Sequence, residues 1–467
     1  MRHQDILSPF NSEAGEKPKG MYDRMFPGLP PCINHPDLLK DLMQLASIMK
    51  GSNDHGGTPA GYTYLGQFIA HDMSFDLVSL TERRFTMENP SNYRTPALDL
   101  DSVYGGGPMM QPYLYEECVG NFIFRFNEKS EFKKGVLRAP KKLKEEQGPA
   151  IIPDPRNDEN VVIEALHMAI MSLHNTLVKN PNKLPEHHHT PYEAFIATRK
   201  EVLKYYHWCI LKDYLPRIVG YELISDILTQ GRKYFKWDKK PYIPVEFSIA
   251  AFRFGHSQVS NNYNFNKAET SRPLFRKHTS DSIPEIDWRY FFPDEDNPYK
   301  GNKNKKIGPF IAGNILNRSF SVTMPVINDQ VKDLIGEIDI PKIDEMNLAQ
   351  RNLMRGYLNH LPSGQSVARI MGIEPLSVNS IGNMPPCFVD NTPLWYYLLF
   401  EAYKLKEGEQ LGPVGGQIVA EVLIGLLESD AQSILKAGAN WNPTDHKGQV
   451  KCDFNMTDLL KLAGVYE

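Results

Sequence analysis

Cysteine is scarce in this chain, and the few cysteines present do not pair by spacing. The 467 residues include 5 cysteines, which are far apart, odd in number and never in a Cys-x-x-Cys arrangement. This pattern argues against a disulfide scaffold, a structural zinc site and thioether attachment of a cofactor. A mostly reduced compartment is the simplest interpretation.

Long apolar runs are also missing. A membrane-spanning helix needs about 18 to 20 apolar residues, and the longest candidate, residues 418–427, is shorter and is interrupted by Glu421. The first twenty residues lack the apolar core of a signal peptide. We therefore expect no membrane span, and either a cytoplasmic location or export by a non-classical route.

No excess of charge of one sign points to a polyanionic partner. The chain has 52 Lys and Arg against 56 Asp and Glu, a formal net charge of -4, so we expect no nucleic acid partner. Hydrophobic residues make up 41% and charged residues 23% of the chain, which is typical of a globular protein with a substantial core.

Helical periodicity dominates the chain, and strand signals are weak. Helices are predicted by apolar spacing at 65–71, 158–180, 192–214, 246–256, 343–358, 363–371, 392–405, 414–428 and 458–462. Asp158 and Glu159 are expected in the first turn of the second of these, and Leu215 before Pro216 at the end of the third. Residues 84–115 and 262–320 are expected to be mostly loop.

These patterns predict a mainly α fold with one large helical domain. We place the domain at residues 51–430, because no linker within that range is clear enough to divide it. Residues 1–50, rich in Pro and Gly, are predicted to form an extended N-terminal arm. Residues 431–467 are predicted to form a C-terminal extension packed on the domain.

Four segments contain residues that could do chemistry, although each is ambiguous alone. A histidine within an apolar helical stretch, such as His71, is more often a buried core residue than a functional one. Asp72 could be its partner or a surface carboxylate. Residues 95–105 alternate oxygen donors, which suits calcium but also a polar turn with side-chain caps. Arg156, just before a long helix, could bind an anion or pair with a carboxylate. His256 follows a glycine at a helix end with Arg253 three residues before it, which suits an axial metal ligand.

In order and spacing, these segments together resemble the animal-type haem peroxidases, the peroxidase–cyclooxygenase superfamily. Residues 67–72 resemble the family's distal histidine motif, and residues 95–105 resemble its calcium loop. Residues 154–160 resemble its distal arginine segment, with His167 at the expected distance onward. Residues 251–256 and 351–356 resemble the segments with the proximal histidine and the proximal asparagine. The resemblance covers roughly residues 20–430, and residues 360–366 and 392–395 look more like microbial members.

The resemblance implies a haem b group between helices and a role for each matching residue. His71 would be the distal base, Arg156 the distal arginine and Gln67 a distal-pocket amide. His256 would be the proximal iron ligand, and Asn352 would hydrogen-bond its other ring nitrogen. Arg253 and Arg355 would pair with the haem propionates.

The resemblance also implies calcium and limits covalent haem attachment. The calcium ligands would be Asp72, Thr95, Ala97 through its backbone carbonyl, Asp99 and Asp101. Glu159 matches one position at which the family esterifies haem, whereas Ala70 replaces the acid at the other, so one ester link is compatible and two are not. Asn160 replaces the methionine of a sulfonium link, which argues against strong chloride oxidation.

The function implied is a peroxidase with a role in peroxide stress. It would reduce hydrogen peroxide and oxidise a small organic or (pseudo)halide donor through a ferryl intermediate. An alternative is a haem-dependent dioxygenase of fatty acids or other organic substrates, but Arg253 stands where that branch has a radical-forming tyrosine. Two further readings are a non-catalytic haem-binding protein, against which His71, Arg156 and His256 argue together, and a non-haem metal site at residues 187–189, where a solvated loop is favoured.

Overall fold

The computed structural model describes most of the chain outside its first 21 residues. The described residues are 22–32, 37–51, 54–75, 94–118, 120–130, 133–140, 148–180, 189–238, 240–274, 285–294, 301–316, 346–378, 383–436 and 441–466. Much of the predicted N-terminal arm, residues 84–93 of the predicted loop, 187–188 of the histidine run and 343–345 of a predicted helix lie outside them.

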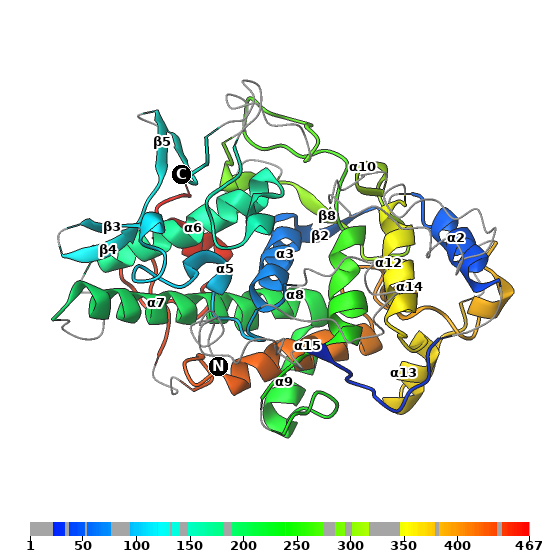
Figure 1. Cartoon of the computed structure of the whole chain (residues 1–467). Helices are drawn as coiled ribbons and strands as arrows, with labels where there is room; N and C mark the ends of the chain where they lie inside the picture. Colours follow the sequence, from blue (N-terminus) through cyan, green and yellow to red (C-terminus); the bar gives the residue numbers. More distant parts are fainter. Residues whose placement is uncertain are drawn as a thin grey trace, which may run out of the picture.

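Helices form most of the regular structure, which confirms the mainly α prediction (Figure 1). The α-helices are α2 (Leu38–Ile48), α3 (Gly61–Met73), α5 (Asp101–Tyr104), α6 (Val161–Val178), α7 (Pro191–Trp208), α8 (Leu215–Val219), α9 (Tyr221–Gln230), α10 (Gly313–Leu316), α12 (Leu348–Leu358), α13 (Gly364–Ile370), α14 (Leu394–Leu405), α15 (Pro413–Ser429) and α16 (Met456–Leu462). Shorter 3-10 turns are η1 (Pro112–Leu114), η2 (Pro155–Asp158), η6 (Ala251–Ser257), η7 (Trp288–Tyr290) and η9 (Pro386–Phe388), and π-helical turns are η4 (Cys209–Tyr214) and η5 (Glu246–Ala250).

The strands of the described residues are short and form separate two-stranded pairs. The pair β1 (Tyr22–Asp23) and β7 (Ile243–Pro244) is parallel, with Tyr22 opposite Ile243. The other pairs are antiparallel: β2 (His55–Pro59) with β8 (Lys303–Lys305), β3 (Tyr115–Cys118) with β4 (Asn121–Phe124), and β5 (Asn127–Ser130) with β6 (Lys133–Gly135). The pair β3–β4 packs against α6 and α7, but the pairs are small and most of the core lies between helices.

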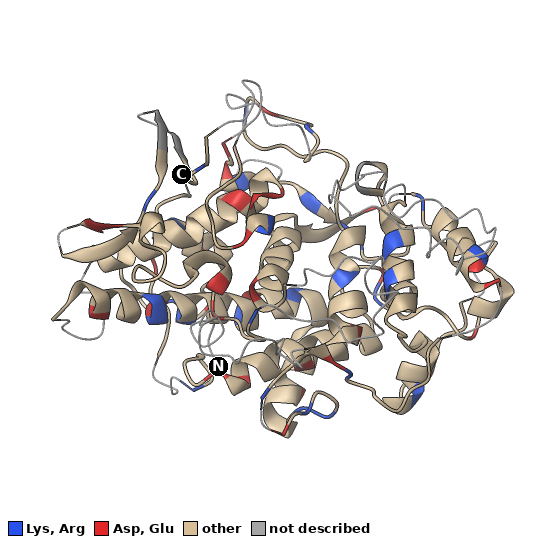
Figure 2. Ribbon diagram, viewed as in Figure 1, with Lys and Arg blue, Asp and Glu red and all other residues tan. Residues whose placement is uncertain are grey.

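One continuous cluster of buried apolar residues extends from Tyr22 to Ala463. Helix α6 lies within it, and although this 18-residue helix is apolar and long enough to cross a membrane, 72% of it is buried inside the protein. Acidic and basic residues are interspersed over the ribbon in the view of Figure 2. The boundaries expected at residues 50 and 430 stay predictions.

The predicted N-terminal arm is not wholly extended, because it contains helix α2. Leu38, Leu42 and Leu45 recur at helical spacing and are buried, and α2 packs against α12. The surrounding Pro and Gly residues concealed this periodicity. Two further corrections are short: α5 lies within the segment 84–115 expected to be loop, and α9 was not predicted.

The helix expected at 158–180 begins later than predicted. Asn160 is its N-cap, and the Asn160 side chain accepts hydrogen bonds from the amides of Val162 and Ile163. Asp158 therefore lies in the preceding turn η2 and Glu159 is the C-cap of that turn, so neither is in the first turn of α6. Asp158 forms an ion pair with Arg138, and Arg138 forms a second ion pair with Glu164.

The helix expected to end at Leu215 continues past Pro216. After α7 the chain widens into the π-helical turn η4, and Pro216 stands in the first turn of α8, where no amide hydrogen is needed. The chain turns only at Gly220, whose φ of 86° lies in the left-handed region that glycine tolerates.

Asp213, in η4, ties the helix that leads to the candidate site to the C-terminal part of the chain. Its buried carboxylate accepts hydrogen bonds from the Tyr62 hydroxyl in α3 at 2.8 and 2.9 Å and from the Met456 amide at 2.9 Å. Arg217 forms an ion pair with it at 2.8 Å. Asp213 thus joins α3, α8 and α16 through one carboxylate.

We expect Asp213→Ala to lower the free energy of unfolding by about 3 kcal/mol, because two buried donors lose their acceptor. Urea unfolding would measure the change. The matched control is Asp226→Ala, at an exposed position of α9, with an expected change below about 0.5 kcal/mol. Equal stability of the Asp213 variant and the control would contradict the tie.

Candidate active site

Helix α3 presents Gln67 and His71 on one face, because they are separated by one helical turn. Two glycines allow this helix to pack closely. A Cβ atom at Gly61 would lie 2.5 Å from the Phe292 ring, and one at Gly66 would lie 2.5 Å from the Tyr214 hydroxyl oxygen. Helix α3 packs against α6, η2 and η6, so it lies between the two segments that contain the predicted distal and proximal residues.

His71 is held by a chain of side-chain hydrogen bonds. Its Nδ1 lies 2.9 Å from the Asn157 Oδ1. The Asn157 Nδ2 in turn lies 3.1 Å from the His167 Nδ1 and 3.4 Å from the Ser102 carbonyl oxygen. Since an amide oxygen only accepts, His71 must donate through Nδ1–H, and its Nε2 therefore carries the free lone pair.

The electrostatics of the site keep His71 neutral. Burial, reinforced by the positive charge of Arg156, lowers the pKa of His71 to about 3. Burial also lowers the pKa of His167 to about 4, which agrees with a His167 ring that accepts from Asn157. A neutral His71 with a free Nε2 is a base that can take a proton at neutral pH.

Arg156 is clamped by a buried carboxylate. Asp154, which has no exposed surface, accepts from the Arg156 Nε at 3.0 Å and Nη2 at 2.7 Å. Arg94 pairs with the same carboxylate at 2.7 Å. Burial by itself would raise the pKa of Asp154, but the hydrogen bonds and charge of Arg156, followed by the charge of Arg94, hold it well below its usual range.

The clamp also joins Arg156 to the histidine helix. The Arg156 Nη2 donates to the His71 carbonyl oxygen at 2.8 Å, and the guanidinium carbon lies 4.6 Å from the centre of the Phe75 ring. The Nη1 atom has no hydrogen-bond partner among the described residues. The chain thus places the predicted distal arginine beside the predicted distal base.

Gln67 and Glu159 lie together on this side of α3. The Gln67 Nε2 donates to the Glu159 Oε2 at 3.1 Å, and the Asn160 Nδ2 donates to the Gln67 Oε1 at 3.4 Å. The carboxylate predicted for an ester link is therefore beside the predicted distal amide. Gln67, His71, Arg156 and Glu159 are brought into one neighbourhood from two separate segments of the chain.

His256 lies on the irregular helical segment η5–η6 and not on a regular α-helix. The Asn352 Nδ2 lies 2.9 Å from the His256 Nδ1, and the Trp395 ring meets the His256 ring edge-on, with centroids 6.4 Å apart. Although the residue as a whole is only partly buried, its imidazole is enclosed. Burial and the charges of Arg253, Arg355 and Arg351 lower the pKa of His256 to about 3, so the ring is neutral, as a metal ligand requires.

Three arginines surround this histidine, and no carboxylate contributes to its pKa. The Arg253 Nη1 donates to the Asn352 Oδ1 at 3.2 Å. The Arg355 Nε is buried and has no hydrogen-bond partner among the described residues, and burial lowers the pKa of Arg355. A buried guanidinium without a carboxylate is costly, so this position is suited to an anionic group.

The predicted calcium residues gather behind α3. Asp72 has no exposed surface, and its Oδ2 accepts from the Leu100 amide at 3.0 Å. The Asp72 Oδ1 accepts from the Ser102 hydroxyl at 3.3 Å. Leu100 has a φ of 57°, a strained conformation for a branched side chain, and its amide thereby reaches Asp72. Asp72 therefore holds the 95–101 loop against the helix that contains His71.

Several oxygens of this cluster lack partners. The buried Thr95 Oγ1, Asp99 Oδ2 and Asp101 Oδ2 have no hydrogen-bond partner among the described residues. Burial and mutual repulsion raise the pKa values of Asp72 and Asp99, and burial raises that of Asp101 despite its ion pair with Arg199 at 2.9 Å.

The geometry of the cluster is not that of a closed metal site. No three His, Cys, Asp or Glu side chains of the described residues are placed so that they could hold one ion together. Arg199 also donates to the Asp99 carbonyl at 2.9 Å, and the Ala97 amide bonds the Thr95 carbonyl at 2.8 Å. The structure thus brings the predicted calcium residues close together, but their oxygen atoms do not point toward one common position.

Sequence reasoning assigned no role to three residues that organise the site: Asp154, Asn157 and Trp395. Asp154 and Asn157 flank Arg156 in the sequence, but nothing in their order shows that one clamps the arginine and the other bridges two histidines. His167 had been expected at the family's distance from the arginine segment and to pack or cap internally, but not to bond Asn157. The sequence signal of Asp154 and Asn157 is that polar residues precede an apolar helix, which is also typical of an ordinary helix cap.

The sequence model of the animal haem peroxidases matches residues 74–380, which is more than half of the chain. The chain therefore belongs to the animal haem peroxidase family. The match contains Arg156, His256 and Asn352, and it begins just after His71.

Relatives agree with this family. The chain is 25% identical over 228 residues to Peroxinectin A of Dictyostelium discoideum, covering 47% of this chain and 37% of the relative. It is 23% identical over 297 residues to the thyroid peroxidase of Mus musculus, covering 59% and 30%. The matched regions thus span about a third of these relatives' own length.

Solved structures share the fold. Peroxidase A from Dictyostelium discoideum superposes with a TM-score of 0.58 at 15% identity, covering 94% of this chain and 90% of that one. A fatty acid alpha-dioxygenase of Arabidopsis thaliana gives a TM-score of 0.55 at 13% identity, covering 93% and 74%. Identities this low support the fold alone.

We expect the His71 ring to carry its proton on Nδ1 and to remain neutral at pH 5. Nitrogen-15 NMR of the imidazole would show one protonated and one unprotonated nitrogen. Asn157→Leu, which is similar in size but cannot accept a hydrogen bond, should mix the two tautomers, whereas Asn180→Leu at an exposed position should change nothing. A wild-type ring protonated on Nε2 would contradict this hydrogen-bond chain.

Proposed function

We propose that this protein is a haem-dependent peroxidase that reduces hydrogen peroxide and oxidises a small organic or (pseudo)halide donor. The observation that carries this proposal is the pairing of two differently built sides. One side presents a neutral base, His71, beside a clamped cation, Arg156. The other presents a neutral histidine, His256, beside three arginines, and one of these, Arg355, has a buried Nε without a hydrogen-bond partner among the described residues. Helix α3 packs against the segments that contain both sides.

The residues present suit a haem group. The orphaned Nε of Arg355 and the guanidinium of Arg253 offer partners for the two carboxylates of haem, and His256 would hold its iron. Haem, when bound, supplies the electron transfer chemistry that peroxide reduction and donor oxidation need. The protein's part is to hold the group, position the peroxide and move its protons.

On the distal side, His71 and Arg156 have separate tasks. The free Nε2 of His71 accepts a proton from hydrogen peroxide and returns it to the leaving oxygen, a transfer worth about 10²–10⁴-fold in rate. Arg156 stabilises the negative charge that develops as the bond between the oxygens breaks. Because Asn157 fixes the proton of His71 on Nδ1, the ring does not have to exchange tautomers before it acts.

On the proximal side, Asn352 sets the ring of His256. A histidine that binds iron through Nε2 must carry its proton on Nδ1, so Asn352 must present its amide oxygen to that proton. In the structure Arg253 occupies this oxygen at 3.2 Å. If Arg253 paired with a haem carboxylate instead, the Asn352 amide would be free to turn its oxygen toward the His256 Nδ1–H, so we expect haem binding and the tautomer of His256 to be coupled.

The alternative is a haem-dependent dioxygenase of fatty acids or other organic substrates. It gains support from the shared fold with a fatty acid alpha-dioxygenase. Arg253, three residues before His256, weakens it, because this guanidinium bonds Asn352 where a radical-forming tyrosine would be needed. A regiospecific product that requires O₂, with peroxide only as an activator, would favour the alternative over the peroxidase.

Two finer features also belong to the proposal. Glu159, which lies beside Gln67, would form a single ester link to haem. Calcium would bind Asp72, Thr95, the Ala97 carbonyl, Asp99 and Asp101. The buried Thr95 Oγ1 and Asp99 Oδ2, which have no hydrogen-bond partner among the described residues, support a hard cation there, because a buried polar oxygen without a partner is costly. We further propose that the protein acts in the cytoplasm or is exported by a non-classical route.

The test of the function is an absorption spectrum of haem-supplemented protein before and after one equivalent of hydrogen peroxide. The wild type should bind haem and change its spectrum on adding peroxide, and His256→Ala should lose or displace the main band. His71→Leu should still bind haem but respond to peroxide about 10²–10⁴-fold more slowly.

Arg355→Gln should weaken haem binding by about tenfold, since it removes one charged pair. Arg369→Gln, at an exposed position of α13, is the matched control and should bind haem as the wild type does. A wild type that binds no haem would refute the proposal, and one that binds haem but ignores peroxide would favour the dioxygenase.

We expect calcium to stabilise the protein by about 2.7 kcal/mol at one hundred times its dissociation constant. Chelation should reverse the gain, and the double variant Asp99→Asn with Asp101→Asn should not respond to calcium at all. Asp226→Asn should respond as the wild type does. Thermal unfolding with and without calcium measures this change in stability. If neither calcium nor a chelator changed the stability of the wild type, the proposed calcium site would be refuted.

A further inference from the structure

We propose that a cavity between α2, α12 and the start of α14 binds a small uncharged, mostly apolar molecule, and that His256 senses this molecule through Asn352. The cavity adjoins His256 on the side of Asn352 and Trp395, and His71 and Arg156 are not among the residues that line it. The part of the proposal that concerns binding is independent of haem. The part that concerns sensing rests on the proposed function, because it requires His256 to hold the iron.

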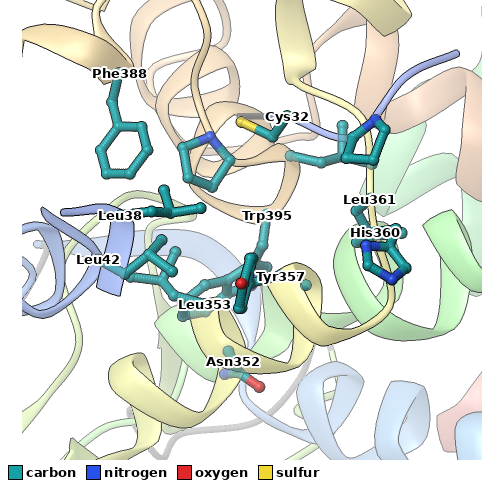
Figure 3. Close-up of a pocket in the computed structure, with 14 residues that line it drawn as sticks. Cys32, Leu38, Leu42, Asn352, Leu353, Tyr357, His360, Leu361, Phe388 and Trp395 are labelled. Carbon is teal, nitrogen blue, oxygen red and sulfur yellow. The ribbon is translucent and has the colours of Figure 1, made fainter. Parts of the chain in front are cut away.

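The lining of the cavity selects against charge. Figure 3 shows Leu38, Leu42 and Phe388 on one side and Leu361 on the other, and Leu353 contributes from α12. No Asp, Glu, Lys or Arg is among the lining residues. A charged ligand would lose its hydration here without gaining a partner, whereas an apolar one would gain by leaving water.

The size of the cavity sets the size of its ligand. Its volume is about 110 Å³. This is smaller than the apolar cavity of about 150 Å³ that binds benzene, so the ligand can be no larger than a single aromatic ring or a short alkyl chain. A long-chain fatty acid is too large for this volume, and its carboxylate would find no cation in the lining.

The rim adds weak polarity without charge. The Cys32 thiol donates to the Asn391 carbonyl oxygen at 3.1 Å. Burial, with a smaller contribution from Cys387, raises the pKa of Cys32 to about 12, so the group stays a neutral thiol. His360 lies at the exposed rim, where a ligand would enter. A hydroxyl or an amide on the ligand could therefore be tolerated at the rim, but the ring itself must be apolar.

Two lining side chains touch His256. The Asn352 Nδ2 lies 2.9 Å from the His256 Nδ1. Trp395 meets the His256 ring edge-on at 6.4 Å, and its Nε1 donates to the Arg253 carbonyl at 3.3 Å. A molecule in the cavity contacts both, and so restricts the rotation of the Asn352 amide on which the tautomer of His256 depends. Occupancy of the cavity thereby alters the electronic environment of the iron.

Gly356 provides a specific way to close the cavity. It lies in α12 and lines the cavity, and a Cβ atom there would meet only the Leu361 Cδ1, at an ordinary 3.7 Å. Gly356→Ala is therefore tolerated and leaves most of the space open. Gly356→Leu extends a side chain into it, and both variants favour the helix over glycine.

Fluorobenzene is the probe, and its fluorine-19 NMR signal reports binding to the haem-loaded protein and to the protein without haem. Wild type and Gly356→Ala should bind saturably, with dissociation constants within about threefold of each other. Gly356→Leu should bind at least about tenfold more weakly, because the side chain fills the void. Leu38→Phe fills the cavity from α2 and should have the same effect if the leucine variant fails to fold.

The outcomes separate the two parts of the proposal. Absence of saturable binding in the wild type, or equal binding by both filled variants, overturns the site. Displacement of fluorobenzene by equimolar palmitate overturns the restriction to small uncharged ligands. In the haem-loaded wild type, fluorobenzene should shift the main absorption band, and Gly356→Leu should abolish the shift. Binding without a shift overturns the sensing, and failure to bind haem at all refutes the proposed function but leaves the NMR result valid.

Discussion

The carboxylate of Asp154 is the interaction on which the candidate active site depends. It is completely buried between two guanidinium groups, Arg94 and Arg156, and it also accepts the Arg156 backbone amide at 3.0 Å. Its two partners come from the segment after residue 93 and from the turn before α6. Arg94, whose side chain is only 4% exposed, depends on it most, because losing the carboxylate partner of a buried charge costs several kcal/mol.

Fixing Asp154 also fixes the residues that follow it. The turn η2 begins at the residue after Asp154. Three functional residues follow within six positions: Arg156 is the clamped cation, Asn157 bridges two histidines, and Asn160 caps helix α6. Each acts on a different neighbour, so their mutual spacing must be rigid. A buried ion pair at the head of the turn supplies that rigidity, and α6 behind the turn supplies the packing.

The two sides of the site differ in electrostatic character. On the His71 side the two cations, Arg94 and Arg156, are both paired with one buried carboxylate, Asp154. On the His256 side burial and the charges of three arginines lower the pKa of the histidine. The first arrangement suits a cavity that handles protons on a neutral substrate. The second suits the anchoring of an anionic group, and the two would interfere if they were exchanged.

Sequence alone predicted the helices whose apolar spacing is strong, namely α3, α6, α7 and those between 348 and 429. It missed α2, whose neighbours are rich in Pro and Gly, and it misplaced the start of α6, because an Asn cap and an acidic first turn look alike. The site residues came from ordered motifs, since His71 by itself is indistinguishable from a core histidine. The role of Asn157 could not be predicted from the sequence, because it bridges two histidines that come together only when α3 and α6 pack against each other.

The segment before His256 has a further consequence. The π-helical turn η5 has more residues per turn than an α-helix, and the 3-10 segment η6 that follows has fewer. The imidazole points where it does because of this order of winding. Removing one residue from η5 would rotate everything after it by about 100° around the axis and aim the ring away from Asn352. The chain length between residues 246 and 256 is therefore as much a part of the site as any side chain, and family members should tolerate substitutions there far better than insertions or deletions.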